Sequence, residues 1–323
     1  MREKLIELCL LQAALLLALG GTAAAAGAQS YPSKPIRIIT SDPGGGADVS
    51  ARAIAQEISG PLGQQVIVEN RGGGVVAGQM VSKAAPDGYT LLYYGSSIWL
   101  RPLIRKDVPY TVNDFAPITL ATSSPAVLVV HPSLPAKSVK QLIALAKSKP
   151  GALNYASAAT GTTNHLAAEL FKYMARVDIV RIVYKGTGGA LLDVIAGHVQ
   201  LTFAAGAAAA PHVKSGRLRA LGVTSAQPSR AYPELPTIAS AGLPGYEAVS
   251  PIALFAPAAT PAAIINRLNQ EVARVLNRAD IRETFLKNGV ETIGSSPEQL
   301  MARIKSEVDK MGNVIKAAGI RDE

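Results

Sequence analysis

Short apolar runs alternate with amphipathic stretches along most of the chain, and this alternation constrains the fold more than any other feature. Ile36–Thr40 is a strand candidate, and helical spacing follows over Ala47–Ser59. The order repeats with strand candidates at Val66–Glu69 and Thr90–Tyr94. Strands that alternate with helices in this way predict a parallel sheet with helices on both faces.

A second round of the same pattern follows. We expect two separate strands at Ile118–Ala121 and Ala126–Val130, because a Ser-Ser-Pro sequence stands between them. Strands and helices then alternate again, starting with a helix for which Ser138 is a candidate cap. Val249–Phe255 is a late apolar strand, and Pro261–Gly319 is mostly amphipathic helix.

Two α/β units in series, with a late return segment, predict two lobes joined by crossing strands. Residues 29–124 and 250–323 would form the first lobe, and residues 125–249 the second. The predicted fold class is therefore α/β, with a mostly parallel sheet flanked by helices in each lobe. Ligands of open α/β sheets bind beyond the carboxyl ends of the strands, so we expect a ligand cleft between the lobes.

Residues 1–28 have the features of a secretory signal peptide. Arg2 and Lys4 precede an apolar stretch from Leu8 to Leu19, and small residues follow up to Ala28. We expect cleavage after Ala28 and export of the mature chain. An N-terminal membrane anchor is the alternative, but the apolar stretch is short for a bilayer.

Composition and charge exclude several classes of protein. The only cysteine, Cys9, lies in the predicted signal peptide, so a disulfide framework and a cysteine-rich zinc site are excluded. Aromatic residues make up 5%, too few for a base-stacking surface. Residues 125–249 carry twelve basic and five acidic residues, without a basic cluster or a recognition motif. We therefore expect no nucleic acid partner, but either a general attraction for anions or a role in solubility alone.

The first candidate binding loop follows the first strand and leads into a helix. Its glycines expose backbone N–H groups, and the start of the helix adds a partial positive charge, as in sites that hold a carboxylate or a phosphate. An ordinary tight turn is the alternative. The candidate residues are Asp42, Pro43, Gly44, Gly45, Gly46, Ala47 and Asp48, the last of which could cap the helix.

The second candidate loop has the same layout in the other lobe. Small residues after a strand lead into a helix, and threonine hydroxyls accompany the free N–H groups. Two such loops facing each other would suit a ligand with an acid group at one or both ends, whereas a simple helix cap is the alternative. The candidates are Thr160, Gly161, Thr162, Thr163 and Asn164.

No set of residues predicts catalysis, a cofactor or a metal. The glycine-rich stretch at 72–77 lacks the acidic residue that a dinucleotide site needs, and the phosphate-loop and nucleophile-elbow motifs are missing. His165 and Glu169 lie four apart on a predicted helix, but no second pair completes a metal site. We find no combination of nucleophile, base and acid.

An ordered set of short motifs covers the chain from about residue 31 to its end. They are Tyr31-Pro32-Ser33-Lys34-Pro35-Ile36, Pro43-Gly44-Gly45-Gly46-Ala47-Asp48 with Ala51-Arg52, Val68-Glu69-Asn70-Arg71, Pro86-Asp87-Gly88-Tyr89-Thr90-Leu91-Leu92, Asn113-Asp114-Phe115-Ala116-Pro117, His131-Pro132-Ser133-Leu134-Pro135, Tyr184-Lys185-Gly186, Glu234-Leu235-Pro236-Thr237, Gly242-Leu243-Pro244-Gly245-Tyr246 and Ala256-Pro257-Ala258-Ala259-Thr260-Pro261. With this set the chain resembles the Bug family of periplasmic solute receptors, the substrate-binding proteins of tripartite tricarboxylate transporters.

The resemblance implies a two-lobed type II periplasmic-binding fold, no enzymatic activity and no cofactor. It implies a monomer in the periplasm that captures a carboxylated molecule and delivers it to the membrane permease. Presentation of the ligand to a membrane sensor kinase is an alternative, and an exported hydrolase of similar fold is a weaker one. The resemblance assigns both loops to carboxylate binding, and it adds Gly95, Ser96, Ser97, Tyr184, Lys185, Gly186 and Ala205 to the cleft.

Several positions depart from the family pattern and affect the identity of the ligand. Ser41 and Asp42 stand where the family has an apolar or aromatic residue, and Ser250 stands where a bulky aromatic is common. The carboxylate of Asp42 would repel a ligand carboxylate at the nearby helix start. We therefore expect a ligand other than a plain aliphatic diacid.

Overall fold

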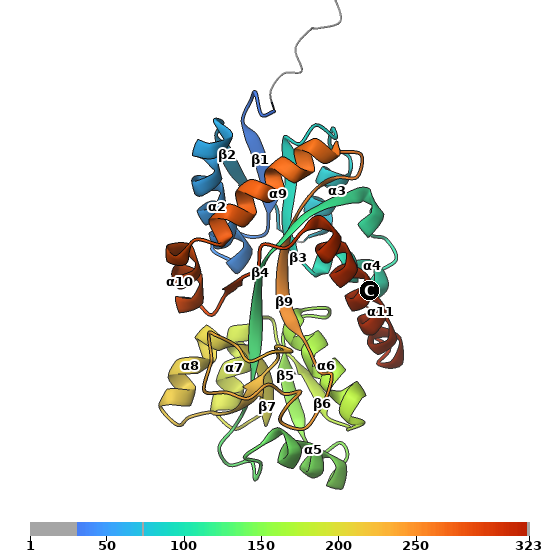
Figure 1. Ribbon diagram of the computed structural model, residues 1–323. Coiled ribbons are helices and arrows are strands. Elements are labelled where there is room, and N and C mark those ends of the chain that lie inside the picture. Colours follow the sequence, from blue (N-terminus) through green and yellow to red (C-terminus); the bar gives the residue numbers. More distant parts are fainter. Residues whose placement is uncertain (1–30, 73, 322–323) are drawn as a thin grey trace, which may run out of the picture.

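The computed structural model describes residues 31–72 and 74–321, and the predicted signal peptide lies outside the described residues. Within them the chain forms two α/β lobes, one above the other in Figure 1, with long strands running between them. None of the described helices is long and apolar enough to cross a membrane.

The strands of the described chain join in one sheet that runs through both lobes in the order β2-β1-β3-β9-β4-β7-β5-β6, with β8 and β10 also paired to β4. Their bounds are β1 (Ile36–Thr40), β2 (Val66–Asn70), β3 (Thr90–Gly95), β4 (Phe115–Val130), β5 (Asn154–Ser157), β6 (Val180–Val183), β7 (Leu201–Ala205), β8 (Arg219–Val223), β9 (Val249–Pro257) and β10 (Glu291–Thr292).

The helices lie between these strands and at the end of the chain. Their bounds are α2 (Gly46–Leu62), α3 (Val75–Ser82), α4 (Ser97–Ile104), the short 3-10 helix η2 (Val112–Asp114), α5 (Val139–Ser148), α6 (Thr163–Ala175), α7 (Thr187–Ile195), α8 (Gly206–Lys214), α9 (Ala262–Leu276), α10 (Ala279–Lys287) and α11 (Pro297–Ala317).

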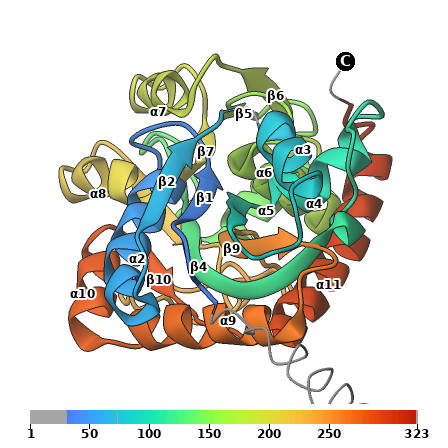
Figure 2. The same cartoon turned by 90° about the horizontal axis from the view of Figure 1, so that it is seen from above.

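In the first lobe, β1 lies between β2 and β3 and is parallel to both. Its two faces are buried in different cores: Ile36 and Ile38 pack with α2 and α9, whereas Ile39 packs with α3 and α4 (Figure 2). Burial of both faces explains the nearly continuous apolar run of this strand, as expected in a parallel sheet.

The second lobe repeats this layering around β5, which is parallel to β6 and β7. Helices α5 and α6 cover one face of its sheet, and α7 and α8 cover the other. Ser138 caps α5, as the sequence predicted, since its hydroxyl accepts a hydrogen bond from the backbone N–H of Gln141 at 3.2 Å.

The expectation of two strands on either side of Ser123-Ser124-Pro125 was wrong, because β4 is continuous from Phe115 to Val130. Up to Pro125 it pairs with β9, and from Ala126 it pairs with β7 and β8. Proline lacks the N–H that a ladder needs, but its fixed φ fits extended backbone. Pro125 therefore stands where the strand changes partners rather than where it ends.

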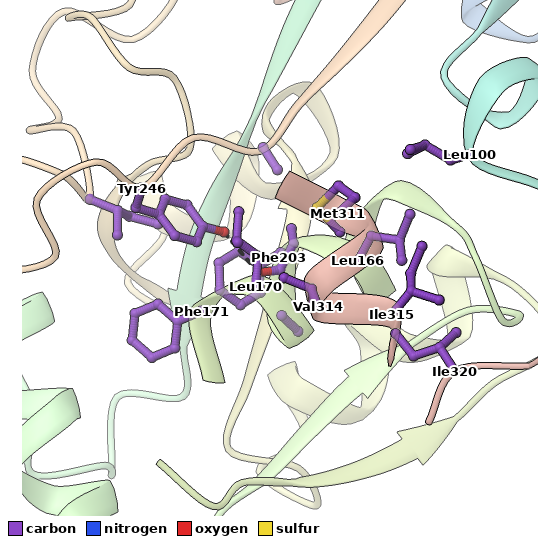
Figure 3. Close-up of a cluster of buried hydrophobic side chains, with 14 of the residues drawn as sticks. Leu100, Leu166, Leu170, Phe171, Phe203, Tyr246, Met311, Val314, Ile315 and Ile320 are labelled. Atoms are coloured by element: carbon purple, nitrogen blue, oxygen red, sulfur yellow. Dashed lines mark hydrogen bonds between the residues drawn. The ribbon is translucent and has the colours of Figure 1, made fainter. Parts of the chain in front are cut away.

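Helix α11 connects the two lobes through a shared hydrophobic core. Met311, Val314 and Ile315 of α11 belong to the same buried cluster as Leu166 and Phe171 of α6 (Figure 3). Trp99 and Leu100 of α4 extend this cluster into the first lobe. Helix α4, which the sequence analysis did not predict, thus faces both α11 and the second lobe. We propose lobe limits near residues 124 and 249, where β4 changes partners and β9 begins.

Candidate functional site

A cavity of about 560 Å³ lies between the lobes. Its walls come from the loops at the carboxyl ends of the strands, from the middle of β4 and from the loop before β10. The lining residues are Gly46, Gly95, Ser96, Ser97, Arg101, Ser124, Pro125, Ala126, Gly161, Thr162, Thr163, Asn164, Thr187, Phe203, Ala205, Gly206, Ala207, Tyr232, Ser250, Asn288, Gly289 and Val290. We call it the interlobe cavity.

Five helices begin at this cavity: α2, α4, α6, α7 and α8. None of the five has a side-chain hydrogen bond that caps its N-terminus. The first N–H groups of a helix have no partner within the helix and carry partial positive charge. The ends of these helices therefore supply donors for an anion.

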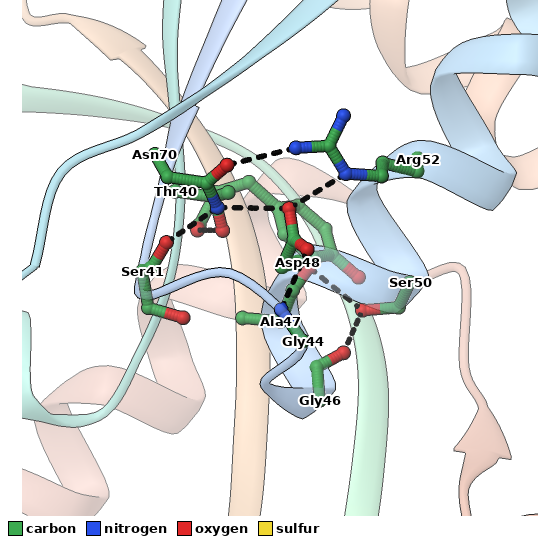
Figure 4. Close-up of polar contacts among 10 residues, drawn as sticks. Thr40, Ser41, Gly44, Gly46, Ala47, Asp48, Ser50, Arg52 and Asn70 are labelled. Atoms are coloured by element: carbon green, nitrogen blue, oxygen red, sulfur yellow. Dashed lines mark hydrogen bonds and ion pairs between the residues drawn. The ribbon is translucent and has the colours of Figure 1, made fainter.

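The first candidate loop is held together by its own side chains (Figure 4). The carboxylate of Asp48, only 4% exposed, accepts a hydrogen bond from the backbone N–H of Gly44 at 2.9 Å and one from the amide of Asn70 at 2.8 Å. It also forms an ion pair with Arg52 at 2.9 Å, and Asn70 donates to the carbonyl of Ser41 at 2.7 Å. Asp48 thus fixes the loop rather than capping α2 directly.

These contacts determine the charge state of Asp48. The hydrogen bond from Gly44 stabilises the carboxylate most, and Asn70 and Arg52 add to it, so that the pKa of Asp48 lies below its ordinary value despite burial. Its contribution to stability is therefore fully present at neutral pH.

Only Gly46 of the first candidate loop lines the interlobe cavity. Asp42 is exposed at the edge of the loop, where its carboxylate lies against the backbone of Gly72. It also contributes to a raised pKa of the Tyr94 hydroxyl, of which burial is the main cause. The negative charge of Asp42 thus lies beside the cavity and not in its wall.

The second candidate loop presents more of its residues to the cavity, from Gly161 to Asn164. Gly161 has φ 78°, a conformation that favours glycine, and an added Cβ would come within 3.1 Å of Ile104 in the other lobe. The hydroxyl of Thr162 is engaged within the loop, at 2.7 Å from both the carbonyl of Ala159 and Oδ1 of Asn164. The hydroxyl of Thr163 has no hydrogen-bond partner among the described residues, so it is available to a ligand.

Arg181 of β6, which does not line the interlobe cavity, braces this loop. Its guanidinium donates to the hydroxyl of Ser157 and to the carbonyl of Ala158, both at 2.8 Å, and to the hydroxyl of Thr160 at 3.3 Å. The parallel pairing of β5 and β6 sets Arg181 opposite Tyr155, just before the loop. A rigid loop costs less conformational entropy when a ligand binds.

His165 supports the same loop as a neutral acceptor. Its Nδ1 accepts a hydrogen bond from the backbone N–H of Gly161 at 3.1 Å. Burial, with the positive charge of Arg181 nearby, lowers the pKa of His165 to about 4. The ring is therefore neutral at physiological pH, and its Nδ1 is engaged in holding the loop. The described residues contain no group of three or more His, Cys, Asp or Glu side chains that could hold a metal ion.

The structure thus separates the predicted site residues into two groups. Those in the cavity wall are Gly46, Gly95, Ser96, Ser97, Gly161, Thr162, Thr163, Asn164 and Ala205. The others lie outside the wall, and they are Asp42, Pro43, Gly44, Gly45, Ala47, Asp48, Thr160, Tyr184, Lys185 and Gly186. Gly186 is the N-cap of α7, and the wall residue is its neighbour Thr187.

Six polar residues of the wall were not among the predicted site residues: Arg101, Ser124, Thr187, Tyr232, Ser250 and Asn288. Arg101 belongs to the unpredicted helix α4, and Tyr232 and Asn288 come from loops far from either candidate loop in the sequence. Thr187 could have been found, because it follows Gly186, a predicted site residue that is the N-cap of α7. Arg101 is the one charged residue among the described residues of the wall, so a positive charge faces the cavity and no carboxylate does.

Comparisons with known proteins agree with this architecture. A sequence model described as "Tripartite tricarboxylate transporter family receptor" matches residues 50–320. The protein BugT of Bordetella pertussis is 35% identical over 313 residues, which cover 95% of this chain and 96% of BugT.

Two similar proteins have been solved with an organic acid. Rpa4515 of R. palustris, solved with adipate, is 35% identical with a TM-score of 0.74, over 90% of this chain and 99% of that one. MatC of Rhodopseudomonas palustris, solved with bound malate, is 28% identical with a TM-score of 0.70, over 88% of this chain and 100% of that one.

These likenesses show the type II periplasmic-binding fold that the sequence predicted. They also support the expectation of a receptor rather than an enzyme, because the matched family consists of solute receptors. With a family match over most of its length and a relative at this level of identity, the chain belongs to the tripartite tricarboxylate transporter receptor family.

Proposed function

We propose that this protein captures a small carboxylated organic molecule in the interlobe cavity and delivers it to the permease of a tripartite tricarboxylate transporter. The setting would be the periplasm, after export and cleavage near Ala28. The observation that carries the proposal is the meeting of five uncapped helix starts and Arg101 at a cavity whose described wall holds no carboxylate.

The wall chemistry favours a carboxylate over other ligands. Backbone N–H groups at helix starts bind anions, and hydrogen bonds to a charged acceptor are stronger than those to a neutral one. Ser96, Ser97 and Thr163 add hydroxyl donors next to these helix starts. Among the described residues of the wall a cation would find only neutral acceptors, and it would meet the positive charge of Arg101.

The size of the cavity and two related receptors support the same class of ligand. About 560 Å³ is within the usual range for pockets that enclose small molecules. Relatives solved with adipate and malate hold small dicarboxylates in the same overall fold. We propose carboxylates as the ligand class here, with a preference for those that carry a further polar group.

The test is a thermal-shift screen of the exported protein against mono- and dicarboxylates, followed by calorimetry on the strongest ligands. A ligand that binds only the folded state raises Tm by mass action. We expect carboxylates to raise Tm and matched amides or alcohols to have no effect. A screen in which no carboxylate raises Tm, or in which the neutral analogues do so equally, would refute the proposal.

Arg101→Gln is the matched variant for this test. Loss of the positive charge should weaken carboxylate binding about tenfold, because a hydrogen bond to a charged partner is lost in a partly enclosed site. Lys106→Gln, at an exposed position just beyond the same helix, is the control and should leave affinity unchanged. Equal effects of the two changes would mean that general charge, not the site, attracts the ligand.

A further inference from the structure

A second, smaller cavity lies behind the interlobe cavity. It measures about 150 Å³ and lies between α4, α6, α11 and the segment that leads into β9. Ser96 and Thr163 line both cavities, so the two spaces adjoin at the point where the two lobes face each other. We call the smaller space, whose wall also holds Glu247, Arg303 and Glu307, the rear cavity.

The wall of the rear cavity carries more charge than that of the interlobe cavity. It contains two acids, Glu247 and Glu307, and two bases, Arg303 and Lys310. Arg303 forms an ion pair with Glu247 at 2.9 Å, and Lys310 donates to the backbone carbonyl of Glu247 at 3.5 Å. The four charges cancel, so the rear cavity does not favour a ligand group of either sign.

Among the described residues, Oε2 of Glu307 and Nε of Arg303 are buried without a hydrogen-bond partner, as is Nε1 of Trp99, which lies close enough to Glu307 to lower the pKa of its carboxyl. Buried polar groups in folded proteins nearly always have a partner, so such a pair calls for water or a ligand group. Glu307 offers an acceptor and Arg303 offers a donor. A hydroxyl group satisfies both, because its oxygen accepts while its proton is donated.

We propose that the rear cavity is a subsite for an uncharged hydroxyl group at the end of the ligand opposite its carboxylate. The ligand class would then be hydroxylated organic acids, with the carboxylate at the helix starts of the interlobe cavity and the hydroxyl between Glu307 and Arg303. This inference rests on the proposed function, since it assumes that a carboxylate occupies the interlobe cavity.

The electrostatics of Glu307 fit an uncharged partner. Burial raises the pKa of Glu307, and the nearby positive charge of Arg303 offsets this only in part. A hydroxyl group can donate to the carboxyl of Glu307 without adding a charge to this buried wall.

Calorimetry with paired ligands tests the subsite. The wild-type protein would be titrated with a chain-length series of aliphatic monocarboxylates, each beside its counterpart with a terminal hydroxyl. At the length that reaches the rear cavity, the hydroxy acid should bind about tenfold more tightly, as expected for one well-placed hydrogen bond pair. Equal affinities at every length would overturn the subsite and leave the proposed function intact.

Variants at Glu307 test whether the preference for the hydroxy acid depends on this side chain. Glu307→Leu removes the acceptor and should abolish the preference for the hydroxy acid without weakening binding of the plain acid. Asp309→Leu, exposed on the same helix, is the control and should keep the preference. A preference that survives in Glu307→Leu would overturn the assignment.

A more conservative variant guards against misfolding of Glu307→Leu. Glu307→Gln keeps the shape and a hydrogen-bonding end, so it should retain the preference to within about threefold. Loss of the preference in Glu307→Gln, with binding of the plain acid unchanged, would argue against a hydroxyl subsite. If no acid binds the wild-type protein, the proposed function fails, and the subsite fails with it.

Discussion

The two candidate loops have the same layout in sequence, but the structure uses them in different ways. The first loop is held by a network in which Asp48 contacts the backbone of Gly44, Asn70 of β2 and Arg52 of α2. Only Gly46 of this loop lines the interlobe cavity. The second loop is braced from outside by Arg181 and His165 and presents four consecutive residues to the cavity.

This difference shows that two strand-to-helix loops of similar sequence can contribute different kinds of hydrogen-bond donor to one ligand site. The first loop offers backbone N–H groups in a fixed position, which suits a common feature of all ligands, the carboxylate. The second loop adds side-chain donors such as Thr163, which can distinguish between ligands. Selectivity should therefore reside more in the second loop than in the first.

The largest effect should come from opening the network of the first loop. Asp48→Ala removes a buried carboxylate that holds Gly44, Asn70 and Arg52, and it should lower the free energy of unfolding by about 2–3 kcal/mol. Urea unfolding measures this change. The exposed ion pair of Glu283 and Lys287 provides the control, since Glu283→Ala should cost less than about 0.5 kcal/mol.

The same network predicts a dependence on pH. The pKa of Asp48 is lowered from its ordinary value of 3.8, so its stabilisation is present above that value and is lost as pH falls through the lower pKa of the folded state. The stability difference between wild type and Asp48→Asn should therefore be constant near neutral pH and shrink below about pH 4. A difference that shrinks already near pH 6 would contradict this account.

The next largest effect should come from removing the external brace of the second loop. Arg181→Met deletes three hydrogen bonds to residues 157–160, so we expect a loss of about 2 kcal/mol in stability and at least tenfold in ligand affinity. Calorimetry and urea unfolding would record both. Lys185→Met, at an exposed position in the next loop, should change neither; if it weakens binding as much as Arg181→Met, the brace is not the cause.

Thr162 and Thr163 allow a comparison, within the second loop, between a hydroxyl that holds the loop and one that is available to a ligand. Thr163→Val removes a hydroxyl that has no partner among the described residues, so it should weaken ligand binding about tenfold without lowering stability. Thr162→Val removes a hydroxyl that holds the loop together, so it should lower both affinity and Tm. If the two variants behave alike, our distinction between loop-forming and ligand-binding hydroxyls fails.

The smallest effect should come from Asp42, beside the first loop. The side chain is exposed and lies outside the cavity wall, so solvent screens its charge. Asp42→Asn should strengthen binding of plain diacids about twofold to threefold at low ionic strength, and added salt should remove the gain. No change at low salt would mean that Asp42 does not influence ligand choice.

Local patterns predicted the layers of the fold well. The run Ile36–Thr40 matches β1 because burial of both faces leaves a continuous apolar signal in the sequence. The expected break in β4 was wrong because its ladder partners in β9 lie more than a hundred residues away, and they keep Ser123–Pro125 extended against the local turn signal.

The candidate site could be predicted only in part, for a similar reason. Glycines and hydroxyls after strands mark the loops, so Gly46 and Thr163 were found from local sequence. Arg101, Arg181 and Tyr232 act through tertiary contacts that no local spacing encodes. Arg181 braces the second loop only because β6 pairs in parallel with β5, and that pairing depends on the whole sheet.

The shared strand β4 has a consequence for how such a receptor can vary. It extends through both lobes, with on the order of 50 Å of extended chain for its 16 residues. A deletion of one residue within it would turn every later side chain to the opposite face of the sheet. The length of β4 is therefore constrained, so changes of specificity that add or remove residues must arise in the loops, whereas Ser124 and Ala126 of the strand can vary only by substitution.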